Sequence, residues 1–525
     1  MFRRHSQFSR LKRRASIFGG FGLAAALLLT GCTSAVSTEG AAASSAPKKG
    51  GTLHIIQGAD VQPVSIMGQN NPNFSINRLI FNSLIEYEHK TLTPQPSLAT
   101  SWKVSPDGTN ITFELQKGVK FHDGRAFTAA DVIASLQVIQ RPTTSSQMRH
   151  DALLITDMVA TGDSEVTLTL SHGTSNIFDL FDMMPIIDIN TVDALFTGKT
   201  FNGTGPFQVD SYTPGQGFKL SRNNSYWKKG LPYLDGVDIT VVRNSQSMLS
   251  SLRAGQSELA LDLAPLDASS VKGDPNFELV ASDANDSTYY IASNVNVPLL
   301  AKKEVRQGIS YAIDRARILK QVLGDIGSVT SLPWSPASSA YDKTKVNHYT
   351  YNEAKAKSML ADAGAAGQSV NIYYDSGFGP NAGIVEIVQF NLKQAGLDPV
   401  VVPQQSSEFH QNLISGGLNG LFVSGHGFGQ ISPVTLIKGS FPFNADKNAS
   451  LFVNQEYKDL ATELWTETDP AKQKVTIDKV NDLLLDQQFV SDLVNSSHTY
   501  TISKKLHGLE WTMLDYINLD KAYLG

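Results

Sequence analysis

Cysteine is almost absent from this chain of 525 residues, which contains one, Cys32. A lone cysteine cannot close an internal disulfide, so a disulfide framework is excluded. The sequence also lacks the G-x-S-x-G elbow of hydrolases, the H-E-x-x-H zinc motif, the Walker phosphate loop and paired metal-binding cysteines. The common hydrolase, zinc and nucleotide-binding classes therefore miss the residues that their chemistry needs, and we expect no enzyme activity, cofactor or metal.

Long apolar runs and an excess of cations are missing as well. With 41% hydrophobic residues and a mean hydropathy of -0.15, the chain is neither disordered nor a multi-span membrane protein, and its length predicts about three units or two large lobes. Six of the 44 Lys and Arg residues precede any acid, so the chain after residue 31 keeps 38 of them against 49 Asp and Glu, a net charge of -11. Nucleic acid is therefore excluded as a partner.

The N-terminus has the layout of an export signal. A basic stretch at 1–14 precedes the uncharged stretch at 17–29, which is too short to span a bilayer as a helix. The run Leu29-Thr30-Gly31-Cys32 resembles the lipobox of bacterial lipoproteins. This resemblance implies a signal peptide at 1–31 and a diacylglyceryl group on Cys32. Residues 32–49, rich in Ala, Ser and Gly, then form a flexible tether.

Two alternatives for the N-terminus stay open. One is an uncleaved anchor in which the cysteine occurs by chance. The other is export through the twin-arginine route instead of the general secretory route, because Arg13-Arg14 is a basic pair of the kind that both signals carry.

Hydrophobic periodicity predicts alternating strands and helices in the rest of the chain. Strands are expected at 51–57, 102–104 and 111–115. Helices are expected at 76–85, around the apolar stripe at 305–313, and from Asp314 to Gly324. A further helix should begin at Thr128, with Asp131 as its capping partner. From residue 369 the order is strand (370–374), helix (381–395) and strand (397–402). This is a βαβ unit, whose crossover predicts two parallel strands.

Three glycine-containing segments resemble functional motifs. The GxGxxxG at 377–383 lacks an acid at the far end of the following strand, so it does not predict dinucleotide binding. His122-Asp123-Gly124 is read as a hairpin turn and not as a metal or acid-base pair. The run 425–429, Gly-His-Gly-Phe-Gly, follows an apolar strand and is either a loop that approaches a ligand or a plain turn.

Seven segments, in this order, resemble the family 5 extracellular solute-binding proteins of ABC transporters. They are GGTL from Gly50, PSLATSWKVSPDGTNITFELQKGVKFHDGRAFTAADV from Pro96, GTGPFQV from Gly203, RNNSYW from Arg222, LRAGQSELAL from Leu252, VRQGISYAIDR from Val305 and YNEAKAKSMLADAG from Tyr351. The resemblance implies an α/β, two-lobed clamp of the type II periplasmic-binding-protein kind. Lobe one would take 50–290 plus 498–525, with an extra subdomain at about 88–200, and lobe two would take 291–497. Crossovers at 292–297 and 496–501 would form the hinge.

The implied function is capture of a peptide-like or other small polar solute outside the membrane and its delivery to the permease of an ABC transporter. The protein would be a monomer moored by lipid to the outer face of the cell membrane, or periplasmic. By position in the family, loops 69–75, 375–381 and 424–430 should line the cleft. The predicted ligand-binding residues are Gln69, Asn70, Asn73, Phe74, Asp375, Phe378, Asn381, Ser424, His426, Phe428 and Gln430.

One departure from the family pattern bears on the solute. Peptide-binding members carry an aspartate in a WxxDYPDP-like run that pairs with the peptide ammonium, whereas residues 424–433 read SGHGFGQISP and contain no acid. We therefore expect peptides with a free amino terminus to bind weakly, unless Asp375 takes over the pairing. A secreted enzyme that uses His426 as its base, or a surface adhesion module on the same scaffold, remain the alternatives.

Overall fold

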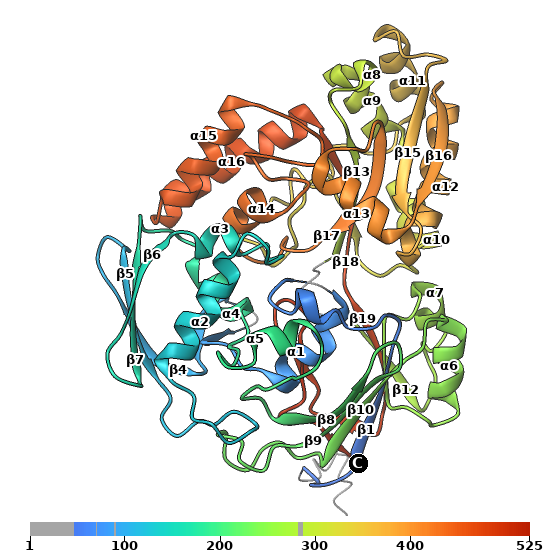
Figure 1. Cartoon of the computed structure of the whole chain (residues 1–525). Helices are drawn as coiled ribbons and strands as arrows, with labels where there is room; N and C mark the ends of the chain where they lie inside the picture. The colour runs from blue at the N-terminus through green and yellow to red at the C-terminus, as the bar shows by residue number, and fades with distance from the viewer. Residues whose placement is uncertain (1–46, 70, 89–90, 282–286) are drawn as a thin grey trace, which may run out of the picture. The chain divides into compact units, whose positions relative to one another are not determined.

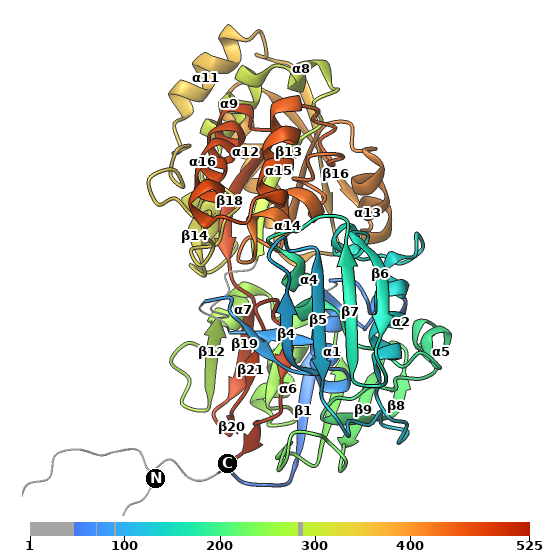
Figure 2. The same cartoon turned by 90° about the vertical axis from the view of Figure 1, so that its left-hand side faces the viewer.

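The computed structural model describes residues 47–69, 71–88, 91–281 and 287–525. The predicted signal peptide, Cys32, most of the tether and Asn70 lie outside the described residues. The described part contains two large sheets and a smaller one, with helices packed on their faces (Figures 1 and 2).

The first large sheet has seven strands in the order β12-β19-β11-β1-β10-β9-β8. Its strands are β1 (Thr52–Gln57), β8 (Phe207–Thr213), β9 (Gly217–Arg222), β10 (Gly236–Val241), β11 (Leu259–Leu261), β12 (Phe277–Ala281) and β19 (Thr499–Ser503). β1 is parallel to both of its neighbours, and every other pair is antiparallel. The C-terminal segment from Thr499 therefore begins as a strand within a sheet whose other strands all lie before residue 282.

The second large sheet has six strands in the order β14-β18-β13-β17-β15-β16. Its strands are β13 (Ser287–Ser293), β14 (Ser328–Val329), β15 (Ser369–Asp375), β16 (Asp398–Gln404), β17 (Leu421–His426) and β18 (Val490–Ser496). β15 and β16 are parallel and are joined by α12 (Gly379–Gln394), which confirms the predicted βαβ unit. Ile372 and Val423 of this sheet belong to one buried cluster with Ile384 and Val388 of α12.

A four-stranded sheet, β4-β5-β7-β6, lies within the expected extra subdomain. Its strands are β4 (Ala99–Val104), β5 (Asn110–Leu115), β6 (Ile155–Ala160) and β7 (Glu165–Leu170). Helices α2 (Ala129–Gln140), α3 (Arg149–Ala152), α4 (Ile177–Met183) and α5 (Val192–Phe196) accompany it. Alternate residues of β5 and β7 are buried, as the alternating sequence pattern predicts.

Short strand pairs and further helices lie within the residues predicted for lobe one. The pairs are β2 (Ile85–Tyr87) with β3 (Pro94–Pro96), β20 (Leu506–His507) with β23 (Tyr523–Leu524), and β21 (Glu510–Trp511) with β22 (Ile517–Asn518). The helices are α1 (Phe74–Ile80), α6 (Ser245–Arg253) and α7 (Pro265–Ser269), with two 3-10 turns at Pro63–Ser65 and Asn71–Asn73.

The remaining helices surround the six-stranded sheet. They are α8 (Pro298–Ala301), α9 (Lys303–Ala312), α10 (Arg315–Gln321), α11 (Glu353–Asp362), α13 (Ser406–Ser415), α14 (Pro433–Gly439), α15 (Gln455–Thr466) and α16 (Pro470–Gln487). Asp314 caps α10 as predicted, because its side chain accepts from the amide of Arg317. The helix ends at Gln321, before the predicted Gly324. Among the described residues, no helix has the length and apolarity needed to cross a membrane.

The chain passes between the two large sheets twice, and the first passage lies earlier than the predicted 292–297. β13 already pairs with β17 and β18, so residues 287–293 belong to the six-stranded sheet and not to the first sheet. The predicted position was wrong because an apolar run such as STYYIAS fits either of the two large sheets. The strands with which it pairs are remote in sequence, so the local pattern does not indicate which sheet it joins. The second passage connects β18, which ends at Ser496, with β19, which begins at Thr499.

Candidate functional site

The loop that follows β17 is buried and tied to its surroundings. Phe428 has a φ of 72°, a left-handed conformation that is costly for a residue with a Cβ and that clusters at functional sites. A Cβ on the next residue, Gly429, would come within 2.4 Å of the carbonyl oxygen of Pro333. Only glycine fits this approach, so a close backbone contact explains the glycine at position 429.

Gln430 connects this loop to the C-terminal part of the chain. Its Nε2 donates to the carbonyl oxygen of Met513 at 2.9 Å, and its side chain is fully buried. Its Oε1 has no hydrogen-bond partner among the described residues. Met513 lies between β21 and β22, close in sequence to Tyr516, whose ring meets Phe74 edge-on at 4.9 Å. One C-terminal segment thus contacts two of the predicted ligand-binding residues.

His426 points into the protein. Its Nδ1 lies 2.7 Å from the carbonyl oxygen of Gly427, and its Nε2 lies 3.6 Å from Oδ1 of the buried Asp492. The ring also packs against Phe443, at a centroid distance of 5.0 Å. Burial raises the pKa of Asp492, and the nearby imidazole opposes that rise. With both ring nitrogens directed at protein groups, this histidine is poorly placed to act as a base on an external substrate.

Ser424 and Tyr290 face each other across the β17–β13 pair. Tyr290 is fully buried, and burial raises the pKa of its hydroxyl. The sequence did not predict that Tyr290 and Asp492 lie beside the 424–430 loop, because only the strand order of the six-stranded sheet brings them there. Neither residue lies in a motif that could have indicated this position.

The loop between β15 and α12 holds its own aspartate. Oδ1 of Asp375 accepts from the amide of Gly377 at 2.8 Å and from Oγ of Ser406 at 2.7 Å. Phe378 is 38% exposed and lies 6.2 Å from the ring of Tyr289. Asn381 is buried, and its Oδ1 has no hydrogen-bond partner among the described residues. Because Oδ1 of Asp375 already accepts from its own loop and from α13, Asp375 is a weak substitute for the missing ammonium partner.

In the 69–75 segment, the amide side chains of Gln69 and Asn73 form hydrogen bonds with other parts of the protein. Oε1 of Gln69 accepts from the amide of Gln147 at 3.1 Å. Asn73 exchanges two hydrogen bonds with the backbone of Gln62, at 2.7 and 3.0 Å. The amide side chains of Gln69 and Asn73 are thus used for contacts within the protein. Phe74, in contrast, contacts the C-terminal part of the chain through Tyr516.

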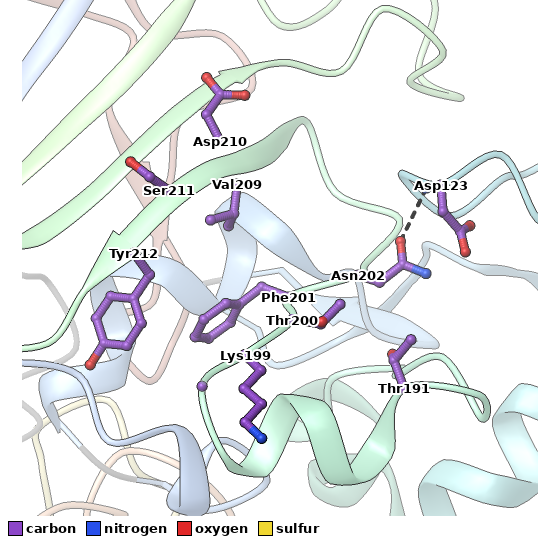
Figure 3. Close-up of a pocket in the computed structure, with 11 residues that line it drawn as sticks. Asp123, Thr191, Lys199, Thr200, Phe201, Asn202, Val209, Asp210, Ser211 and Tyr212 are labelled. Carbon is purple, nitrogen blue, oxygen red and sulfur yellow. Dashed lines mark hydrogen bonds between the residues drawn. The ribbon is translucent and has the colours of Figure 1, made fainter.

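A pocket of about 300 Å³ lies beside β8 of the seven-stranded sheet (Figure 3). The dashed line in the figure is the hydrogen bond from the amide of Asp123 to Oδ1 of Asn202, at 3.1 Å. The pocket is lined by Asp123, Thr191, Gly198, Lys199, Thr200, Phe201, Asn202, Val209, Asp210, Ser211 and Tyr212. None of the eleven predicted ligand-binding residues lines it.

The residue cluster His122-Asp123-Gly124 at the edge of this pocket is a turn, as predicted. The amide of Gly124 donates to the carbonyl of Phe121, and Gly124 has a φ of 92°. Lys120 and Ala126 form a β-bridge across it. The described residues contain no group of three or more His, Cys, Asp or Glu side chains that could hold a metal ion.

Comparison with known proteins assigns the chain to a family. The sequence profile of the bacterial extracellular solute-binding proteins, family 5 (middle region), matches residues 93–447. This chain belongs to that family. The resemblance predicted from the seven segments is thereby confirmed.

Curated relatives of this family 5 protein differ in the ligands that they are named for. The chain is 30% identical to the Oligopeptide-binding protein AppA of Bacillus subtilis, over 65% of this chain and 64% of that protein. It is 28% identical to Heme-binding protein A of Haemophilus influenzae, over 54% of this chain and 56% of the relative. Both matches span less than two thirds of the relative's length.

A solved structure confirms the predicted fold class, the α/β periplasmic-binding-protein fold. The PBP AgaA from A. tumefaciens R10, in complex with agropinic acid, has a TM-score of 0.80 to this chain at 22% identity. The match covers 90% of this chain and 99% of that chain. Identity at this level supports the fold and carries no conclusion about the ligand.

Proposed function

We propose that this family 5 protein captures a peptide-like or other small polar solute outside the cytoplasmic membrane and delivers it to the permease of an ABC transporter. Family membership over residues 93–447 is the observation that carries the proposal. The fold is consistent with it, because two large sheets built from different parts of the chain can form two bodies that close on a guest. In this proposal lobe one and lobe two are the closing bodies, and the protein acts as a monomer.

The proposed solute site is formed by loops 69–75, 375–381 and 424–430, and the first and third of these contain side chains that contact the C-terminal segment. Two of the predicted residues support it, since Oδ1 of Asn381 and Oε1 of Gln430 are buried acceptors without a partner among the described residues. An unpaired buried acceptor costs about 1–3 kcal/mol, so a donor is expected at each of these oxygens. A solute with N–H or O–H groups would supply such donors.

Mass spectrometry of small molecules released from the protein, purified without refolding, tests the proposal. We expect a defined solute to be retained by the wild type and lost from Gln430→Ala, which removes the side chain that bridges the loop to Met513. Gln455→Ala, at an exposed position on α15, is the matched control and should retain the solute. Release of no small molecule from any preparation that is exported and folded would argue against solute capture.

We also propose that Cys32 carries a lipid that moors the protein outside the membrane, because its position after Leu29-Thr30-Gly31 fits lipoprotein processing. A single acyl chain gives only marginal binding, whereas two chains anchor durably. Native protein should therefore partition into detergent, and Cys32→Ala should move it to the aqueous phase. Equal partitioning of the two forms would contradict lipid attachment.

A further inference from the structure

Thr435 of α14 contacts two side chains beside the subdomain helix α4. Its Oγ1 donates to Oδ2 of Asp179 at 2.5 Å and accepts from Nδ2 of Asn176 at 3.0 Å. The same Nδ2 donates to Oδ1 of Asp151 at 3.0 Å. All four residues are at most 2% exposed. α14, in the chain between β17 and β18, lies beside α3 and α4 of the body that carries the four-stranded sheet (Figures 1 and 2), and the cluster joins the two.

The two carboxyl groups of this cluster are buried without a Lys or Arg partner among the described residues. Burial raises the pKa of Asp179 to about 7, although the hydroxyls of Thr435 and Tyr87 donate to it. Burial raises the pKa of Asp151 to about 8, against the opposing hydrogen bond from Asn176. Both acids are thus costly to ionise while α14 covers them.

Other titratable groups surround the pair. On the subdomain side they are Arg78, Glu86, Tyr87, His150, His172 and Asp182. On the opposite side Lys438 of α14 pairs with Asp446 and packs over Trp465 of α15.

Three of these groups, His150, Asp182 and Arg78, bear on the titration of the pair. His150 lies 3.1 Å from Asp151, but desolvation lowers the pKa of His150 to about 4, so it is neutral above that pH. Arg78 pairs with Asp182, within lobe one. Burial also raises the pKa of Asp182 to about 6, but Asp182 is paired with Arg78 away from α14. His150 packs against Gly439 of α14 and Trp465 of α15, so it regains an ordinary pKa of about 6.5 when the contact opens, and its protonation then opposes the effect of Asp151 and Asp179.

We propose that Thr435, Asn176, Asp179 and Asp151 form a latch that holds α14 on the subdomain and takes up protons as it closes. The inference rests on the proposed function, because it assumes that these bodies separate when the solute is released. It adds a regulation that solute binding alone does not require.

The direction of the pH effect follows from proton linkage. When the latch is open, both carboxyls face water, where an aspartate has a pKa of about 4. When it is closed, their pKa values are about 7 and about 8, so between these limits the closed form binds more protons. Raising the pH across this window favours opening, by up to about tenfold per pH unit for each carboxyl. Above about pH 8 the dependence disappears, and below about pH 6.5 the protonation of an exposed His150 in the open form opposes it.

The distance between two spin labels measures the latch directly. The labels are placed at Thr156→Cys on β6 and Thr462→Cys on α15, both exposed, in the full chain with Cys32→Ala and without added solute. From about pH 5.5 to about pH 8.5 we expect the population with the longer distance to increase at least tenfold. In Asp179→Asn and Asp151→Asn this dependence should be reduced, because an amide does not ionise.

Variants of Thr435 test, by the same distance measurement, whether its hydroxyl holds the latch closed. Thr435→Val keeps the shape of the side chain and loses both hydrogen bonds, so its open population should be larger at every pH. Thr435→Ser keeps the hydroxyl and should match the wild type. The matched control is Thr476→Val, since Thr476 is equally buried but donates to Glu463 between α15 and α16.

A label distance that is independent of pH in the wild type would overturn the latch. An unchanged pH dependence in both Asp→Asn variants would overturn it as well. Because no solute is added, these results are independent of whether mass spectrometry finds one, so failure of the latch and failure of solute capture can be told apart.

Discussion

Asp131 serves two roles in the segment that leads from the 122–124 turn into α2. As the partner of Thr128 it completes the capping box that the sequence predicts. It also accepts from the guanidinium of Arg125, which at the same time pairs with Asp188, both at 2.5 Å. The local pattern predicted the first role. The second could not be predicted, because Asp188 is remote from Asp131 in sequence and its position depends on the packing of α2.

Asp131→Asn should lower the free energy of unfolding by about 2 kcal/mol, because it leaves Arg125 with one carboxylate and weakens the cap. Arg125 is 26% exposed, so water offsets part of the loss. Urea denaturation measures the effect. Asp478→Asn, which removes the exposed Lys474–Asp478 pair, is the control and should change stability by less than about 0.5 kcal/mol. Equal losses in the two variants would contradict the buried network.

At the scale of an element, α1 shows why the boundary of a helix can differ from its sequence pattern. The apolar periodicity predicts a helix over 76–85, but α1 ends at Ile80. The carbonyl oxygen of Ile80 accepts from the amide of Gly205 at 2.9 Å, in place of an amide one turn further along the helix. The GTGPF segment thus terminates a helix that lies far before it in the chain. Pattern reasoning identified the segment but not the reason for its glycines.

Gly203→Ala should be strongly destabilising. A Cβ at this position would lie 1.9 Å from the carbonyl oxygen of Ile80, so the backbone of α1 or of the loop must move. The matched control is Gly379→Ala at the start of α12, where a Cβ meets nothing within 4 Å and the residue is helical. The control should be neutral or stabilise by up to about 1 kcal/mol. Thermal unfolding compares the two, and a Gly203→Ala protein as stable as the control would contradict this close approach.

At the scale of the whole molecule, the order of strands within each sheet decides which residues meet. The family resemblance predicted the fold class and three loops, since those follow from the order of motifs along the chain. It did not predict the pairing of β13 with β17 and β18, which brings Tyr290 and Asp492 beside the 424–430 loop. Partners of this kind come from segments far apart in sequence, and no local periodicity encodes them.

The same arrangement bears on the solute. No acid lies between Ser424 and Pro433, Asp375 is bound by Gly377 and Ser406, and the buried Asp492 faces His426. A peptide ammonium entering this site would therefore lose its hydration without gaining a free carboxylate. Burying an unpaired charge costs several kcal/mol, and each loss of about 1.4 kcal/mol lowers the affinity tenfold.

Dipeptides with a free amino terminus should consequently fail to stabilise the protein. A ligand at 100 times its dissociation constant adds about 2.7 kcal/mol to the free energy of unfolding, which raises the melting temperature measurably. A panel of dipeptides at about millimolar concentration, each paired with its N-acetylated form, can be screened by thermal shift. We expect no rise from the free dipeptides, because their ammonium lacks a partner. If several free dipeptides raise the melting temperature and their acetylated forms do not, an ammonium site is present, and the missing aspartate has been replaced by another acid.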